Sequence, residues 1–504
     1  MKGPAQPAAQ DADTAPRARP ADPPAPAKPQ DHARAGFASG RPRVRIAVVL
    51  LLTLALVLRV LYALHTQSYV AQTDAHSYDV LGSQMAAGHG WATKLFGYAY
   101  RPPGYPFFLS GIYDLVGLPH GADRTAARIV QGALLGTGTV ALIGLLAWEL
   151  FGASAMLVAL GIAAIYLPLV VVGEALMTES LFTPLVLAAT YCAIRSRRAL
   201  HRYRWVLAAG VICGLASLTR TNGLIVGVVL AVLVWSRHPG LRPRALIAPA
   251  LTILVTAITI APWTIRNAEV LHAFVPVTVE TGATLAGTYN HVARKHDWLW
   301  AVGGYHDYAA ITSDRRLSSP ERDRKLTVAV VHYVEQHPVY LPQVIFWNTV
   351  RLLDLGGRHR SRITARTDVD ATAGVADAMT YSFWIVGVLA IIGIFTRAVR
   401  RAPLTLGLML VVLWLSVAVV TTGTPRFRSV LEPFFIILAA LALQTGGRRL
   451  AGGRWRGGER RGAGGRRRLG GRPLGGRRPA AGQASGAVPA PNRRLSSLRR
   501  AAGS

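Results

Sequence analysis

The sequence predicts an all-helical integral membrane protein with about ten transmembrane helices. The chain has 504 residues, 51% of them hydrophobic, and its apolar residues gather between positions 46 and 444. Because an α-helix rises about 1.5 Å per residue, roughly 20 apolar residues cross the ~30 Å hydrocarbon layer of a bilayer. Several such stretches exclude a soluble globular domain. The predicted spans are 46–64, 127–150, 154–173, 178–195, 204–219, 222–236, 245–264, 379–396, 403–421 and 428–446.

Basic residues orient these spans, since Lys and Arg accumulate in cytoplasmic loops. Arg41, Arg43 and Arg45 precede the first span and place the N-terminus in the cytoplasm. With that start, four further basic segments also fall on the cytoplasmic side. One threading thus satisfies all of them, and it predicts a multi-pass plasma-membrane protein with both termini cytoplasmic. The four segments are 195–204, 237–244, 397–401 and the Arg-rich C-terminal region.

The same threading leaves two large extracytoplasmic regions, 65–126 and 265–378. Each contains an apolar stretch that does not have the pattern of a span. The stretch 105–117 is too short to cross a bilayer, and the stretch 339–355 contains polar residues such as Arg351. We interpret both as extracytoplasmic helices that lie at the membrane surface or against the bundle.

The net charge of +31 lies mostly at the two ends of the chain. Residues 1–45 contribute +4 and residues 445–504 contribute +15. The first end is rich in Pro and Ala and the second in Gly and Arg, compositions that do not bury enough apolar surface to fold. We therefore predict a disordered cytoplasmic tail over 1–45, a transmembrane domain over 46–446 and a disordered cytoplasmic tail over 447–504. The last tail is expected near anionic lipid heads, without a specific nucleic-acid partner.

The unusual polar residues of the chain gather at the extracytoplasmic ends of the predicted spans. Ionisable groups at a membrane boundary are costly unless they are paired or used, so each is a candidate site residue. The candidates are Asp74, His76, Tyr78, Lys94, Arg101, Glu179, Arg220, Arg266, Asn267 and Arg426.

These residues, in this order, resemble a known family. The features are Asp74 and Tyr78 after the first span, the turn 101–106 with its following aromatics, Glu179 at the start of the fourth span, Pro262-Trp263 with Arg266-Asn267, and the entry 426–433 to the last span. They are similar to membrane glycosyltransferases of the C-type fold, in the group of protein O-mannosyltransferases and lipid A aminoarabinose transferases. The resemblance covers roughly 46–444. It departs at Ala75, where that group usually has a second acidic residue.

The resemblance implies transfer of a sugar from a polyprenyl-phosphate donor, with inversion, to an extracytoplasmic glycan, lipid or protein. A lipid phosphate departs without a general acid, so the enzyme needs a base for the acceptor hydroxyl and cations for the phosphate. By resemblance, Asp74 is the catalytic base, and Glu179 binds sugar hydroxyls or orients the acceptor. The implied substrate-binding residues are His76, Tyr78, Lys94, Arg101, Arg220, Arg266, Asn267 and Arg426, whose guanidinium groups match phosphate oxygens. No cofactor is certain, and a divalent metal is left open.

Several candidates also have plain structural interpretations. Asp74 is suited to capping a helix that begins near Ala75. Glu179 is suited to complementing the dipole of the fourth span. Lys94 suits a solvated loop, and arginines at a membrane boundary also reach lipid phosphates. The spacing of His291, His296, His306 and Asp307 matches no standard zinc pattern.

Two further function classes compete with the glycosyltransferase. A transporter or flippase for a lipid-linked saccharide shares the basic external residues and the apolar bundle. Transporters usually place their polar sites near the bilayer midplane on broken helices, whereas the charges here lie at the external boundary. A non-catalytic assembly protein or a ligase-like protein of the cell envelope is the third class. The boundary position of the charges favours the enzyme.

Overall fold

The computed structural model describes residues 3, 42–91, 99–117, 124–235, 240, 242–296, 299–301, 306–420 and 423–446. The chain divides into two units, 1–449 and 450–504. The second unit lies outside the described residues, as do Lys94 and nearly all of the two predicted tails.

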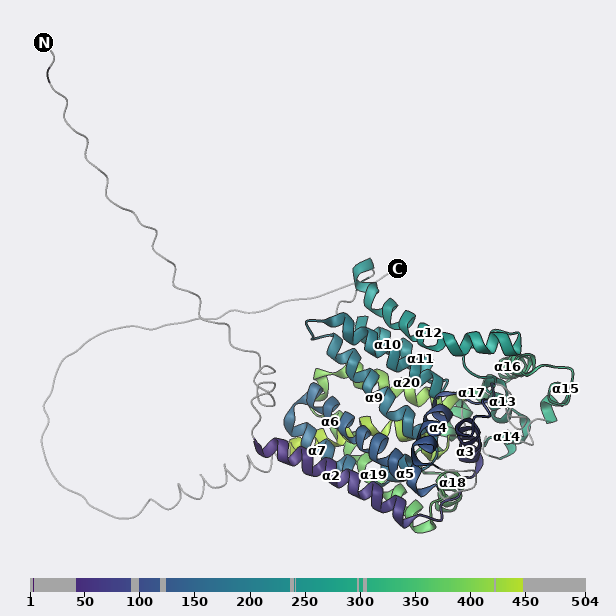
Figure 1. The fold of residues 1–504 in the computed structure, drawn as a ribbon, viewed down its shortest axis with the longest axis horizontal. Helices are drawn as coiled ribbons and strands as arrows, with labels where there is room; N and C mark the ends of the chain where they lie inside the picture. The colour runs from purple at the N-terminus through teal and green to yellow at the C-terminus, as the bar shows by residue number, and fades with distance from the viewer. Residues whose placement is uncertain are drawn as a thin grey trace, which may run out of the picture. The chain divides into compact units, whose positions relative to one another are not determined.

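Every regular element in the described part of the chain is a helix (Figure 1). The α-helices before residue 272 are α2 (Pro42–His65), α3 (Thr73–Ala86), α4 (Gly104–Val116), α5 (Thr125–Gln131), α6 (Thr137–Phe151), α7 (Ala153–Ile165), α8 (Leu167–Glu174), α9 (Thr178–Ser196), α10 (Arg202–Thr219), α11 (Gly223–Trp235) and α12 (Pro243–Leu271). Those that follow are α13 (Thr281–Thr288), α14 (His291–Lys295), α15 (Ala309–Thr312), α16 (Ser319–Gln336), α17 (Tyr340–Leu352), α18 (Arg358–Val369), α19 (Ala373–Ile394), α20 (Pro403–Val420) and a last helix, Glu432–Gly446. A π-helical turn, η1 (Gly132–Gly136), joins α5 to α6, and two 3-10 turns are η3 (Val399–Arg401) and η4 (Pro425–Val430).

Four of these helical segments are long and apolar enough to cross a membrane: α2, the run Thr125–Phe151, α12 and α19. The pair α7 and α8 passes the same test together, bent by 57°. Large apolar side chains such as Val49 in α2, Ile258 in α12 and Ile385 in α19 are more than half exposed, as suits a lipid-facing surface. The chain is therefore a multi-pass membrane protein.

Each of the ten predicted spans corresponds to helical structure, although several bounds differ; the helix predicted from 379, for example, begins at Ala373. The span 154–173 breaks at Tyr166, because Pro168 lies in the first turn of the next helix and cannot continue the previous one. The span 245–264 continues to Leu271. The last span begins at Glu432 rather than 428, because Pro425 starts a 3-10 turn there. Several of the ten helices are too short or too polar to count as spans by themselves, so ten crossings remain a prediction.

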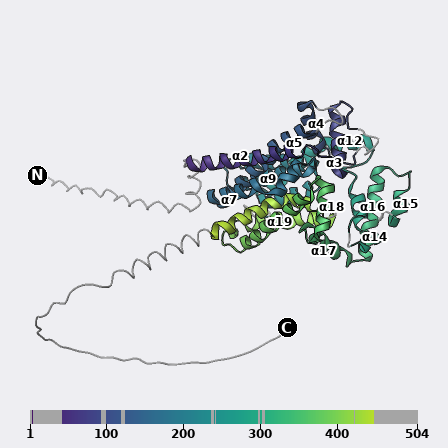
Figure 2. The same ribbon diagram turned by 90° about the horizontal axis from the view of Figure 1, so that it is seen from below.

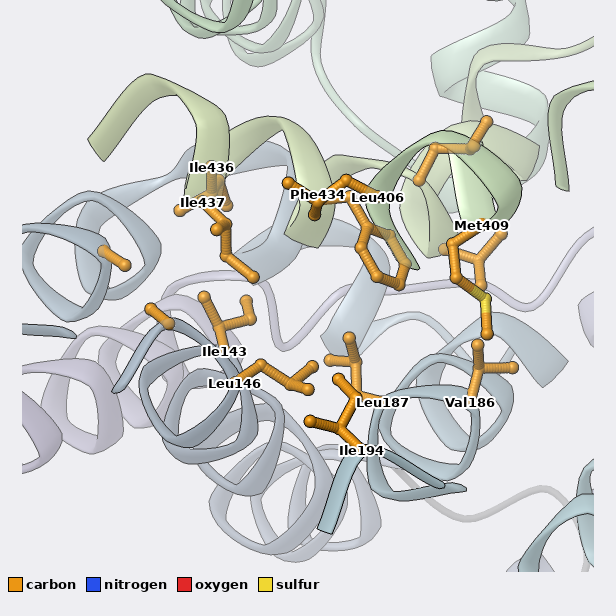
Figure 3. Close-up of a cluster of buried hydrophobic side chains, with 14 of the residues drawn as sticks. Ile143, Leu146, Val186, Leu187, Ile194, Leu406, Met409, Phe434, Ile436 and Ile437 are labelled. Atoms are coloured by element: carbon orange, nitrogen blue, oxygen red, sulfur yellow. The ribbon is translucent and has the colours of Figure 1, made fainter. Parts of the chain in front are cut away.

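Apolar side chains of four helices form the centre of the bundle (Figure 3). Leu146 of α6, Leu187 of α9, Met409 of α20 and Phe434 of the last helix point toward one another and are almost fully buried. Because lipid tails are as apolar as these side chains, close van der Waals packing holds together the helices that carry the polar residues at their ends.

The helices give the bundle two chemically different ends. The helix α9 begins at Thr178, close to the acidic candidate Glu179, and ends in the basic segment 195–204, where α10 starts in the opposite direction. The helices α14, α15 and α16 lie beyond the end at which α10 finishes (Figures 1 and 2). The two stretches interpreted as external helices are indeed helical, as α4 and α17. Carboxylates and arginines therefore meet at one end, and the basic loops lie at the other.

Candidate active site

A cavity of about 360 Å³ lies at the end of the bundle where α10 finishes and α11 begins. Its walls come from segments that are far apart in the sequence. They are the start of α3, the residues before α4, the first residue of α9, the turn from α10 to α11, α13, Trp300, the end of α18 and the turn that contains η4. The predicted base, Asp74, and three of the predicted arginines line it.

Asp74 lies between two guanidinium groups. Its Oδ1 accepts a hydrogen bond of 2.6 Å from Arg101 Nη2, and its Oδ2 accepts one from Arg426. The helix α3 begins at Thr73 with Gln72 before it, so Asp74 is not the capping residue, and the capping interpretation is wrong. Thr73 has a φ of 47°, a costly conformation for a β-branched residue, directly before Asp74.

Arg101 connects three partners that the chain supplies from different segments. Its Nε donates to the Ser77 hydroxyl at 3.1 Å and its Nη1 to Glu280 Oε1 at 2.6 Å, besides the bond to Asp74. The rings of Tyr78 and Tyr100 lie 5.1 and 4.9 Å from the guanidinium carbon. These contacts fix the guanidinium plane, because a fork of donors with three partners has one orientation.

Arg220 ends α10 and pairs with the start of α9. Its Nη1 donates to Glu179 Oε1 at 2.6 Å and to the Thr178 hydroxyl at 2.9 Å. Glu179 is buried and ion-paired with Arg220. It therefore has a specific charged partner in addition to the dipole of α9. Phe427 lies between two cations, 4.8 Å from the guanidinium carbon of Arg220 and 4.6 Å from that of Arg426.

The charges around the cavity are nearly balanced. Arg426 Nε lies 3.4 Å from Asp368 Oδ2, so Arg101, Arg220 and Arg426 face four carboxylates, those of Asp74, Glu179, Glu280 and Asp368. Burial raises the pKa of Glu280 and of Asp368 above the ordinary range. For Asp74 burial also favours the neutral acid, but the guanidiniums of Arg426 and Arg101 outweigh it and hold the pKa of Asp74 below its ordinary range.

Not all predicted site residues meet at the cavity. His76 is exposed and does not line it, whereas Tyr78 two residues later does. Asn267 is buried away from the cavity lining, and its amide donates to the carbonyls of Val275 and Val277, where the chain turns back after α12. Arg266 donates to Asn267 Oδ1 and lies over Trp263, so this pair supports the turn.

Three cavity residues were missed from the sequence. Glu280, Asp368 and Trp300 all belong to the region 265–378, away from the ends of the predicted spans that marked the other candidates. A backbone hydrogen bond of 3.0 Å from Val279 N–H to Ala99 C=O places Glu280 beside Arg101. No local pattern reveals such a long-range contact.

No three His, Cys, Asp or Glu side chains of the described residues are arranged to hold a metal ion. His291 contacts Asp307 as an isolated pair outside the cavity lining. The cavity carboxylates are instead paired with arginines.

Residues 100–265 match the model of a protein family described as dolichyl-phosphate-mannose-protein mannosyltransferase. The predicted resemblance is confirmed over this segment. The part that resembles the mannosyltransferase family contains Arg101, Glu179 and Arg220, and it ends one residue before Arg266. No curated protein matches the chain.

Solved structures of two membrane transferases are also similar. The oligosaccharyltransferase AglB of Archaeoglobus fulgidus, solved with an inhibitory peptide and a dolichol-phosphate, matches with a TM-score of 0.49 and 13% identity. That match covers 86% of this chain and 52% of AglB, so the chain spans about half the length of the archaeal protein. The ArnT protein of Cupriavidus metallidurans, bound to undecaprenyl phosphate, matches with a TM-score of 0.37 and 20% identity over 78% of this chain and 77% of ArnT.

Proposed function

We propose that the protein is a membrane glycosyltransferase that moves a sugar from a polyprenyl-phosphate donor to an extracytoplasmic acceptor, with inversion. The observation that carries the proposal is the cavity at the end of the bundle, where three arginines alternate with carboxylates. The match of residues 100–265 to the dolichyl-phosphate-mannose-dependent family supports the same donor class.

The position of the arginines suits a lipid phosphate. Arg220 follows the last residue of α10, and Arg426 lies in η4 just before the last helix, so both cations stand where bundle helices end. A phosphate held there leaves its polyprenyl chain free to follow the apolar helix surfaces. Bidentate guanidinium–phosphate bonds are among the strong hydrogen bonds of proteins, which offsets the cost of keeping two arginines at this boundary.

Before the donor binds, the carboxylates are ion-paired with the arginines. Asp74 bound to two guanidiniums is a weak base, because its pKa is held below the ordinary range. When a phosphate draws Arg426 away, Asp74 loses one of its two stabilising partners, and its pKa rises toward the range in which it accepts a proton. Donor binding thus activates the base.

The reaction is a single displacement in which one bond to the anomeric carbon forms and one breaks. The acceptor oxygen forms a bond to the anomeric carbon as its proton passes to Asp74, and the bond from that carbon to the phosphate oxygen breaks. The electron pair leaves with the lipid phosphate, which Arg220 and Arg426 stabilise as charge develops on it. Attack from the face opposite the leaving group inverts the anomeric carbon.

Purified protein incubated with radiolabelled polyprenyl phosphates tests the proposal. The donors carry a hexose, a pentose or an aminopentose, and the acceptors are glycan, lipid and peptide fractions of a cell envelope. Transfer of label from one donor to one acceptor class is the expected result. Movement of the labelled donor across vesicles without transfer favours the flippase and overturns the enzyme.

The extracytoplasmic position of the cavity has a separate test. In the proposed topology, the segment around Ala293 and Glu280 belong to the same extracytoplasmic region, 265–378. A cysteine replacing an exposed residue of that segment should react with an impermeant thiol reagent in whole cells. Reaction only after permeabilisation would place the cavity in the cytoplasm.

A further inference from the structure

One wall of the cavity carries no arginine of its own and comes from the segment around α13. Glu280, Thr281 and Thr284 face the cavity together with the indole of Trp300. The cations Arg220 and Arg426 line the cavity from two other segments, the turn after α10 and η4. The segment around α13 thus brings a carboxylate, hydroxyls and an aromatic ring to the cavity, with Arg101 bound to Glu280, while the segments of Arg220 and Arg426, here called the cationic side, bring two further cations.

Glu280 keeps hydrogen-bonding capacity for a ligand. Arg101 Nη1 donates to its Oε1 at 2.6 Å, and within the described part of the chain its Oε2 receives no hydrogen bond. The side chain remains 26% exposed. Because Arg101 fixes the orientation of the Glu280 carboxylate, a ligand hydroxyl can donate to Oε2 from one defined direction.

Trp300 is held in place by the backbone of α13. A Cβ atom on Gly287 would lie 2.0 Å from Trp300 Nε1, so the indole occupies space that only a glycine leaves open. Ala301 N–H donates to Gly287 C=O at 3.0 Å, which fixes the segment on α13. The helix α13 is anchored in turn, because Asp323 Oδ1 of α16 accepts from Gly282 N–H at 2.6 Å. The wall is thus preorganised.

We propose that Glu280 and Trp300 form the subsite that binds the sugar ring of the donor, an inference that rests on the proposed function. Sugar rings present hydroxyl donors at their edge and apolar C–H groups on their faces. A carboxylate with a free oxygen binds the first, and an indole face packs against the second. The phosphate lies on the arginine side, so the ring of the same molecule extends toward this wall.

The bare polyprenyl phosphate and the sugar-linked donor differ in the sugar alone, and only the donor should contact this wall. A polyprenyl phosphate without sugar reaches the cationic side but does not reach Glu280 or Trp300. The wall therefore contributes to the affinity for the sugar-linked donor and not to the affinity for the bare lipid phosphate.

Binding measurements in detergent test this difference. The probes are undecaprenyl phosphate and the undecaprenyl-phosphate sugar from the donor panel that binds the native protein most tightly. The variants are Glu280→Gln, Trp300→Leu and Gly287→Ala, the last of which displaces the indole without changing any cavity side chain. Glu335→Gln, an exposed carboxylate on α16, is the matched control.

Glu280→Gln and Trp300→Leu should weaken the binding of the sugar-linked donor at least about tenfold, the loss expected for one charge-assisted hydrogen bond or one aromatic contact. Gly287→Ala should act in the same direction. All variants should bind the bare lipid phosphate within about twofold of the native protein, which shows that they are folded.

Equal losses for both probes would overturn the subsite, since the wall would then hold the phosphate or the fold. Unchanged affinity for the sugar-linked donor would overturn it as well. If the native protein binds neither probe, the proposed function itself fails, and that result is distinct from a failure of the subsite.

Discussion

Replacing Asp74 by Asn is the most informative single change at the cavity. Asn keeps the size of the side chain but removes the base and its negative charge, so both ion pairs are lost and one neutral acceptor remains. Its Oδ1 still accepts from one guanidinium, while its amide group faces the other. Loss of one charge-assisted hydrogen bond lowers the free energy of unfolding by about 1.5–3 kcal/mol.

The variant should nevertheless remain folded. Arg101 retains Glu280 at 2.6 Å and Arg426 retains Asp368 at 3.4 Å, so neither guanidinium is left without a carboxylate. Loss of a general base costs about 10²- to 10⁴-fold in rate, or ~2.7–5.4 kcal/mol of transition-state stabilisation. We expect the transfer rate to fall by that factor, with no more than a tenfold change in affinity for bare polyprenyl phosphate.

Initial rates of label transfer, together with the thermal midpoint in detergent, provide the assay. Asp377→Asn is the control, because Asp377 also bridges two arginines, Arg358 and Arg362, but lies outside the cavity lining. The control should retain the native rate within about twofold. If the Asp74 variant transfers sugar at the rate of the control, Asp74 is not the base and the reasoning is wrong.

Three further results are expected. Arg428, at the end of η4, is ion-paired with two buried carboxylates, those of Asp354 and Glu432. Arg428→Met leaves both without a cation and should lower the free energy of unfolding by about 3–5 kcal/mol. A native thermal midpoint would contradict this. Gly393→Ala should lower the free energy of unfolding by about 1–3 kcal/mol, because its Cβ would lie 2.0 Å from the backbone oxygen of Leu438, whereas Gly387→Ala in the same helix, whose Cβ meets nothing within 4 Å, should match the native midpoint or exceed it. The pKa of Glu280 is raised in the folded protein, so its stabilising contribution is present below its ordinary value and is lost as pH rises through the raised one. As pH rises between these two pKa values, the thermal midpoint should therefore fall more steeply in the native protein than in Glu280→Gln. Parallel curves for the two proteins would refute the assignment to Glu280.

The sequence contained enough information to locate the helices of the bundle. Long apolar runs determine spans because a bilayer requires them, and each predicted span corresponds to helical structure. What it did not contain was the break at Tyr166 and the 3-10 turn before the last helix. Both depend on how a proline is accommodated among neighbouring helices, which a hydropathy pattern does not encode.

The site was predictable only where it lies next to a span. Asp74, Arg101, Arg220 and Arg426 stand close to helix ends, so their charge at a boundary marked them. Glu280 and Asp368 lie in the long segment between α12 and α19, and they reach the cavity through contacts between distant segments. The same boundary criterion also selected Arg266 and Asn267, which the structure uses to support a turn.

The stoichiometry of a single turnover tests the central claim most directly. In proteoliposomes, sugar transferred to acceptor and lipid phosphate released should appear together, one for one, when donor is present in the leaflet on the cavity side. Arg220→Ala, which removes a phosphate-holding cation that ends α10, should abolish both products together. Release of lipid phosphate without transfer, or transfer that persists in this variant, would contradict the account.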